Sequence, residues 1–197
     1  AGSINSCVSD SNVTTTLSNA SSQVTDTATA IVANVDGISY LVNGSHRYQL
    51  PQEATLRDAF LRAFGIPETA STDATAQWIN LFEQGSPIEQ ISVDGAGNSI
   101  TVHGVEALVG SVVMQQGDAK KTKYVVRSDG SLSPLTDFTY GLYITGKTDE
   151  FTQPNVLSAA DFQFFSNSTE SAIPEDWPSE ELSATSGNVS ACAIYNL

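Results

Sequence analysis

Half of the basic side chains in this sequence lie within one short stretch. Lys120, Lys121, Lys123 and Arg127 are four of the chain's 8 lysines and arginines, whereas the chain carries 22 aspartates and glutamates. A local positive patch in an acidic protein can bind an anionic ligand or partner, or the acidic segment at 170–181 of the same chain. Solvated lysines that protect the edge of a strand would give the same pattern, and this is the simpler interpretation.

Side chains that could perform catalysis are sparse. The chain has only 2 histidines, His46 and His103, and their strand-like surroundings favour a structural or surface role. The sequence contains no Gly-x-Ser-x-Gly elbow, phosphate loop, dinucleotide fingerprint or His-x-x-x-His pair. The 22 acidic residues could supply a carboxylate pair of the glycosidase type, but no spacing singles out two of them. We therefore predict no metal and no cofactor, and we assign no catalytic residue.

The two cysteines of the chain, Cys7 and Cys192, each lie close to one end. Thiols in these positions predict a disulfide that joins the N- and C-terminal segments, which stabilises by about 5 kcal/mol in the chain-entropy model. Such a bridge requires an oxidising compartment. Two free thiols are the alternative, and no histidine or third cysteine lies beside them to support metal binding or thiol catalysis.

Five asparagines stand in Asn-x-Ser/Thr sequons, the acceptor sequence for N-glycosylation. Chance in a chain this rich in serine and threonine gives about 2 or 3 sequons, so accidental sequons remain the alternative. Together with the predicted disulfide and the acidic charge, the sequons predict a secreted, extracellular glycoprotein. The predicted glycosylation sites are Asn12, Asn19, Asn43, Asn167 and Asn188.

The elements that must position these side chains begin with strands. Two turn signals, Asp-Gly at 36–37 and Asn-Gly at 43–44, separate three apolar segments between residues 31 and 50. This pattern predicts an antiparallel meander, because both pairs tolerate positive φ in a tight turn. A capping box that begins at Thr55 and an apolar face over 73–84 then predict two helices.

Further strands are predicted from residue 88 onward. Apolar and polar residues alternate around 91–102, further strands are predicted at 111–115 and 123–127, and the alternation over 138–145 is the clearest in the sequence. Ser158 is predicted to cap a short third helix, with a strand through the following aromatic residues as the alternative.

These elements predict an α+β fold, with a mainly antiparallel sheet, two or three helices packed on it, and N- and C-termini joined by a disulfide. We expect a single domain over residues 1–197 with its core at about 28–165. The segments 1–27 and 166–197 are expected to be extended and tied together by the terminal bridge.

Composition limits the class of function. A formal net charge of −14 disfavours nucleic acid and anionic membranes as partners, and no apolar run approaches the ~20 residues of a membrane span. We predict a secreted, N-glycosylated binding, cell-surface or effector protein without cofactor, whose partner is an extracellular glycan, small molecule or protein. The alternative is a cofactor-free extracellular hydrolase or isomerase that uses a carboxylate pair.

Overall fold

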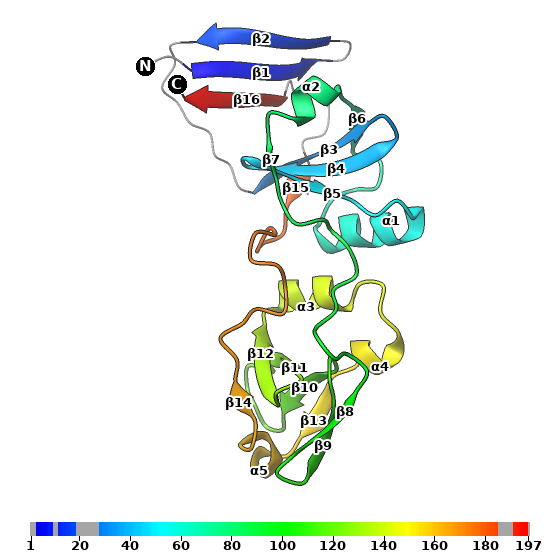
Figure 1. The fold of residues 1–197 in the computed structure, drawn as a ribbon, viewed down its shortest axis with the longest axis vertical. Helices are drawn as coiled ribbons and strands as arrows, with labels where there is room; N and C mark the ends of the chain where they lie inside the picture. The colour runs from blue at the N-terminus through cyan, green and yellow to red at the C-terminus, as the bar shows by residue number, and fades with distance from the viewer. Residues whose placement is uncertain (1–2, 10–11, 19–27, 185–190, 197) are drawn as a thin grey trace. The chain divides into compact units, whose positions relative to one another are not determined.

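The described chain divides into two compact units. Unit 1 is formed from residues 1–89 and 180–197, and unit 2 from residues 90–179. Both units are built mainly from short strands (Figure 1). In this computed structural model the backbone is described for residues 3–9, 12–18, 28–184 and 191–196, and side chains for residues 28–184.

A three-stranded antiparallel meander forms the centre of unit 1. Strands β3 (Thr29–Val35), β4 (Ile38–Asn43) and β5 (His46–Gln49) pair in sequence order, which confirms the meander predicted from the two turn signals. The first turn places Asp36 and Gly37 at φ of 51° and 83°, the left-handed backbone that Asp-Gly pairs tolerate.

Parallel partners extend this sheet. Strands β6 (Ser71–Asp73) and β15 (Ser183–Ala184) each pair parallel with β3, and β7 (Glu83–Gln84) pairs parallel with β5. The sheet of unit 1 is therefore mixed, with short strands from distant parts of the sequence added to the meander.

Two helices complete the core of unit 1. Helix α1 (Ala54–Ala63) buries Phe60 and Leu61, and helix α2 (Ala76–Ile79) buries Trp78, whose ring lies edge-on to Phe82 at 4.8 Å. The N-terminus of α1 is capped by Glu53 rather than by the predicted threonine. The Glu53 carboxylate accepts hydrogen bonds from the first backbone amides of the helix, which have no partner within the helix itself.

The two ends of the chain pair through their backbones. Strands β1 (Ser3–Ser9), β2 (Asn12–Ser18) and β16 (Ala191–Asn196) form an antiparallel sheet in which β1 is central. The register places Cys7 opposite Cys192. The disulfide predicted between them lies outside the described residues, because neither cysteine side chain is described.

Unit 2 contains a five-stranded sheet. Its central strands are antiparallel, and a parallel strand lies on each outer side. In spatial order the strands are β13 (Asn155–Leu157), β10 (Val112–Gln115), β11 (Lys123–Val126), β12 (Ser131–Leu135) and β14 (Ser166–Asn167).

A hairpin and three helices accompany this sheet. The hairpin of β8 (Ser99–Val102) and β9 (Val105–Leu108) packs with Phe162 against a cluster formed by Val113, Val126 and Leu132. The three helices are α3 (Asp137–Ile144), α4 (Asp149–Thr152) and α5 (Ala159–Phe162).

The strand predicted over 138–145 is wrong, because this segment is helix α3. Thr136 and Thr139 form a reciprocal capping box at its start. Leu142 and Tyr143 are adjacent in sequence and both fully buried, which a strand with alternating faces does not allow on a half-exposed sheet. The capping signal and the packing therefore override the alternation of apolar residues.

The predicted fold class is also wrong. The protein is mostly β with a few short helices, and its larger sheets are mixed rather than mainly antiparallel. Parallel pairs join segments that are far apart in the sequence, and several of these strands contain only 2 or 3 residues. Such short strands leave no period-two pattern to detect.

Candidate functional site

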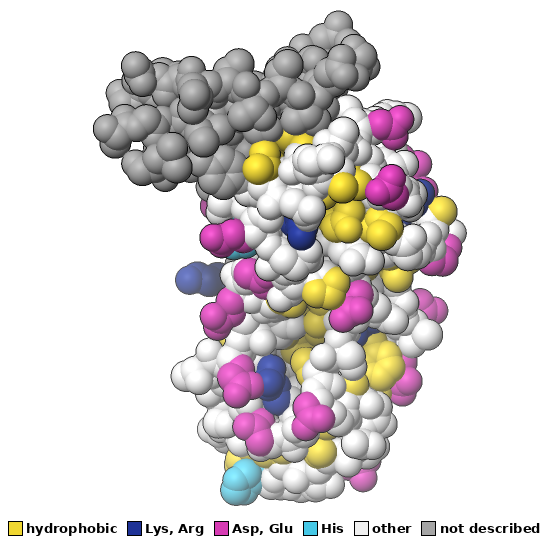
Figure 2. All heavy atoms as spheres, turned by 45° about the horizontal axis from the view of Figure 1, so that its top comes forward, with side chains coloured by type: hydrophobic (Ala, Val, Ile, Leu, Met, Phe, Trp, Pro, Cys, Tyr) yellow, Lys and Arg dark blue, Asp and Glu magenta, His cyan; other side chains and the backbone are white. Residues whose placement is uncertain are grey.

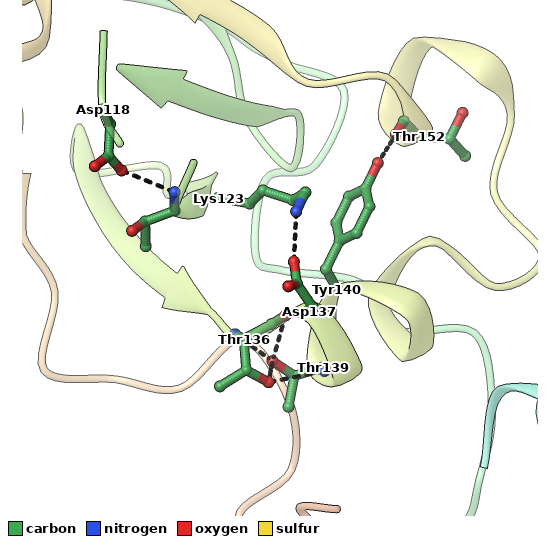
Figure 3. Close-up of polar contacts among 8 residues, drawn as sticks. Asp118, Lys123, Thr136, Asp137, Thr139, Tyr140 and Thr152 are labelled. Atoms are coloured by element: carbon green, nitrogen blue, oxygen red, sulfur yellow. Dashed lines mark hydrogen bonds and ion pairs between the residues drawn. The ribbon is translucent and has the colours of Figure 1, made fainter. Parts of the chain in front are cut away.

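The basic patch predicted from the sequence lies on unit 2, and Lys123 is its most enclosed lysine. The Lys123 Nζ atom lies 2.7 Å from Asp137 Oδ1 and 4.8 Å from the centre of the Tyr140 ring. Figure 3 shows Lys123 reaching from the sheet toward these two residues at the start of α3. The ammonium group lowers the pKa of the Asp137 carboxyl, first through the hydrogen bond and then through its charge, so this carboxyl is ionised at neutral pH.

Arg127 is also neutralised within unit 2. Its guanidinium forms an ion pair with Glu170, and Ser133 Oγ donates a hydrogen bond to the Glu170 carbonyl oxygen at 2.7 Å. Glu170 is the first residue of the acidic segment that the sequence suggested as a partner for the patch. One of the four basic residues thus contacts this segment directly.

Lys120 and Lys121 are exposed and form no ion pair among the described residues. They lie on the loop between β10 and β11, which is organised by Asp118. The Asp118 carboxylate accepts hydrogen bonds from the backbone amides of Lys120, at 3.0 Å, and Thr122, at 2.8 Å. Because these amides stabilise the charged form, they hold the pKa of Asp118 below its usual value. The loop therefore presents two exposed ammonium groups on a fixed turn.

A row of side chains connects the patch to the edge of the sheet. Met114 is aligned with Lys123 on one side and with Val156 of β13 on the other, so the three side chains lie on the same face of the sheet. Val156 is 57% exposed, which is the largest exposure of a large hydrophobic side chain in the described part of the chain. We define the sheet-edge surface as Val156, Met114, Lys123, Lys120 and Lys121.

The segment before β13 is held by a hydrogen bond from α3. Tyr140 donates its hydroxyl to the Thr152 carbonyl oxygen at 2.5 Å, a contact that Figure 3 shows beside Lys123. Tyr140 therefore contacts the patch through its ring and the end of α4 through its hydroxyl. This links the position of the edge strand to that of the basic patch.

The described residues offer little support for catalysis at this surface. Among residues 28–184, no group of three His, Cys, Asp or Glu side chains could hold a metal ion. The two histidines lie elsewhere: His46 is 3.5 Å from Glu83, and His103 stacks on Phe164. Figure 2 shows acidic side chains spread over the visible face with few basic ones among them.

Two of the five predicted glycosylation sites lie within the described side chains. Asn43 uses its amide nitrogen to donate a hydrogen bond to the Thr29 carbonyl oxygen at 2.8 Å, and Asn167 is exposed on β14. The side chains of Asn12, Asn19 and Asn188 lie outside the described residues.

Sequence reasoning located the four basic residues but missed their surroundings. The edge strand β13 follows Pro154 and contains only three residues, so it carried no periodic signal. Asp137 directly precedes the segment that was predicted as a strand and is instead the first residue of α3, and the strand prediction did not place it near Lys123. The one signal that could have corrected this was the Thr136–Thr139 spacing, which is typical of a helix start.

The fold and this surface define the class of the chain as a β-rich module with mixed sheets, an exposed sheet edge and a basic loop beside it. Residues 4–196 match the family described as "Type VII secretion system ESX-1, transport TM domain B". The match spans almost the whole sequence, and the chain belongs to this family. A comparison with curated protein sequences gives no match.

Solved structures share the fold. The periplasmic assembly from the ESX-5 inner membrane complex contains a chain with a TM-score of 0.77 and 17% identity, over 98% of this chain and 48% of that one. An intact ESX-5 inner membrane complex gives 0.73 and 15%, over 98% and 44%. The EccB3 dimer from the ESX-3 core complex gives 0.73 and 16%, over 98% and 51%. The chain thus spans about half the length of the proteins it resembles.

The family overturns the predicted function and localisation. A freely secreted, extracellular, N-glycosylated binding or effector protein is wrong, and so is the alternative of an extracellular hydrolase or isomerase, since the family is a component of a secretion system. Sequons, terminal cysteines and acidic charge describe the chemistry of a surface. They do not distinguish a free protein from part of an assembly. In the described residues, no helix is both long enough and apolar enough to cross a membrane.

Proposed function

We propose that the chain is a periplasmic part of a type VII secretion inner-membrane complex, and that it acts by binding other proteins of that complex. The observation that carries this proposal is the family match over residues 4–196. It is supported by the shared fold with chains of the periplasmic assembly from the ESX-5 inner membrane complex and of the EccB3 dimer. The partner is then an assembly component rather than an extracellular glycan or small molecule.

The surface chemistry of unit 2 agrees with this proposal. Two of the basic side chains are paired internally, whereas Lys120 and Lys121 are exposed on the loop after β10, and Val156 is exposed on the neighbouring edge strand β13. Edges of this kind are recognised by other polypeptides through main-chain hydrogen bonds, with side chains adding specificity.

Affinity purification from membranes tests the proposed function. The full-length protein that contains this chain would be tagged, extracted in mild detergent and analysed by mass spectrometry and electron microscopy. We expect other components of the secretion complex to co-purify in a fixed ratio. Deletion of the segment that corresponds to residues 4–196 should abolish the co-purification of these components and reduce secretion.

Recovery of the tagged protein alone, from cells that assemble a functional secretion complex, would contradict the proposal. The location is tested separately with a cysteine introduced at exposed Thr101. Spheroplasts should label this cysteine with a membrane-impermeant maleimide without lysis. Labelling only after lysis would place the module on the other side of the membrane.

A further inference from the structure

Strand β13 has one free main-chain edge. It is the outermost strand of the unit 2 sheet and, among the described residues, pairs only with β10. Leu157 uses its carbonyl to accept a hydrogen bond from the Gln116 amide at 2.8 Å, so the polar groups of Leu157 face β10. Because successive residues of a strand direct these groups to opposite sides, the N–H and C=O of Val156 face away from the sheet.

This edge carries no charged side chain, although it is short and follows Pro154, two features that limit pairing at edge strands. Free edges are commonly covered, bulged, or interrupted by charged side chains. Residues 153–157 read Gln-Pro-Asn-Val-Leu and contain no charge. The side chain next to the free main-chain groups is Val156, which is 57% exposed. An apolar side chain beside an unpaired donor and acceptor is the combination that an added strand requires.

The charge beside the edge identifies the chemistry of the occupant. The β10–β11 loop starts at Gln116, which is bonded to the end of β13, and it carries Lys120 and Lys121. Lys123 and Arg127 are already paired with carboxylates of the same unit. The two loop lysines are therefore the part of the patch available to a partner, and they favour a segment with acidic side chains.

We propose that β13 is a strand-addition site for an extended segment of another protein of the secretion complex. The segment places an apolar side chain next to Val156 and a carboxylate near Lys120 and Lys121. This inference rests on the proposed function, because it names the contact by which the module joins the complex. A second copy of β13 fits less well, since residues 153–157 offer no carboxylate to the lysines.

Site-specific photo-crosslinking in the full-length protein tests the proposal. A photoreactive phenylalanine analogue would replace Val156 in cells that assemble the complex, with Thr101, exposed on β8 of the same unit, as the control position. We expect an adduct at position 156 with another component of the complex, mapped to an extended segment that contains an acidic residue. An adduct with a second copy, equal adducts at both positions, or no adduct in an assembled complex would overturn the proposal.

A main-chain variant tests the hydrogen-bonding part. Val156→Pro removes the outward N–H without touching the bonds to β10, and Asn155 before it is already extended, as a residue preceding proline must be. We expect the variant to fold with an unchanged circular dichroism spectrum and to bind the mapped segment about tenfold more weakly. Val156→Thr keeps the N–H and should restore most of the binding. Equal binding by the proline variant would refute strand addition.

A charge variant tests the role of the loop. Lys120→Gln with Lys121→Gln should weaken binding several-fold at low salt and little at high salt, because the attraction is screened. The control, Gln52→Glu with Thr69→Glu, changes the net charge equally at exposed positions of unit 1 and should leave binding unchanged. An equal effect of both pairs would overturn the role of the loop, because it would show that only net charge matters. Failure of the proposed function is distinct, since the wild-type protein would then co-purify with no complex at all.

Discussion

At the scale of single residues, one buried side-chain nitrogen in the described part of the chain has no hydrogen-bond partner. Trp78 is fully buried, and its indole Nε1 has no hydrogen-bond acceptor among the described residues. The side chain is retained for its packing in the cluster with Val35, Val42 and Phe82. An unpaired buried donor is costly, whereas the large aromatic surface around it is stabilising.

We expect Trp78→Phe to change the free energy of unfolding by less than about 1 kcal/mol, because it removes the unpaired donor along with part of the ring. Trp78→Ala should cost about 3–5 kcal/mol through the cavity it leaves. Denaturant unfolding followed by circular dichroism measures both. A phenylalanine variant as unstable as the alanine variant would show that the indole N–H has a partner after all.

Tyr143 shows the opposite case of a buried polar group with a well-formed bond. Its hydroxyl donates to the Gly110 carbonyl oxygen at 2.7 Å, and burial raises the pKa of the phenol. Tyr143→Phe leaves this carbonyl without its donor and should destabilise by about 1–3 kcal/mol. Tyr140→Phe, which loses a bond to a less buried carbonyl, is the matched control and should cost less. The free energies of unfolding of the two variants give the comparison directly.

Asp118 links a single carboxylate to the acid stability of the protein. Its pKa is lowered by the amides of Thr122 and Lys120, so its contribution is present above the unfolded-state pKa and is lost as the pH falls through the folded-state value. We expect the Tm of Asp118→Asn to lie below that of the wild type at pH 7. The two should converge as the pH falls below about 4. Parallel Tm curves from pH 7 to pH 3 would contradict this account.

At the scale of elements, the residues that follow α1 pack closely against the segment that leads into β15. Gly65 has φ +84°, and a Cβ there would lie 2.5 Å from Glu181 Cγ and 3.0 Å from the Leu182 carbonyl oxygen. Leu182 in turn donates its amide to the Phe64 carbonyl oxygen at 2.7 Å. The glycine is therefore required by its backbone conformation and by this close approach.

Gly65→Ala should destabilise by about 2–4 kcal/mol, because it combines backbone strain with a clash. Gly37→Ala is the matched control: its φ is +83°, but a Cβ there meets nothing within 4 Å. The control should cost only the strain, about 1 kcal/mol. Thermal and denaturant unfolding of both variants measure the difference. Equal losses would show that Glu181 and Leu182 move aside at no cost.

The elements also show which parts of the fold the sequence could predict. The meander was predictable because Asp-Gly and Asn-Gly pairs, here Asp36-Gly37 and Asn43-Gly44, are typical of the tight turns in β-hairpins. The outer parallel strands were not, because their two or three residues are defined only by distant partners. Helix α3 was mistaken for a strand because eight residues can satisfy both periods, and the buried pair Leu142 and Tyr143 is visible only in the structure. Likewise, Lys120 and Lys121 could be located from the sequence, whereas the three-residue edge strand β13 could not.

At the scale of the whole molecule, the structure shows which residues of the basic patch are paired in a chain whose net charge is −14. Half of that patch is neutralised within unit 2, by Asp137 and Glu170. The remaining lysines, Lys120 and Lys121, lie on the loop between β10 and β11. Composition could describe this surface but not its use, because a secreted protein and an assembly component share the same surface chemistry. The family match supplied that distinction.

The two units differ in how they are connected, and this predicts how fragments will fold. Unit 2 is continuous over residues 90–179, whereas unit 1 needs residues from both ends of the chain, since β15 pairs with β3 and β16 with β1. We expect the fragment 90–179 to fold cooperatively by itself, because it has its own buried cluster and a length of about 90 residues is sufficient for a small core.

The fragment 1–89 alone should fail to fold, because it lacks the strands that residues 180–197 contribute. Joining 1–89 to 180–197 through a flexible glycine-serine linker should restore a folded unit 1, since the linker replaces only the chain of unit 2. Dispersion in proton NMR spectra and cooperative melting by circular dichroism distinguish these outcomes. A folded 1–89 fragment would show that the terminal strands are dispensable, whereas an unfolded linked chain would show that unit 1 depends on unit 2 for its stability.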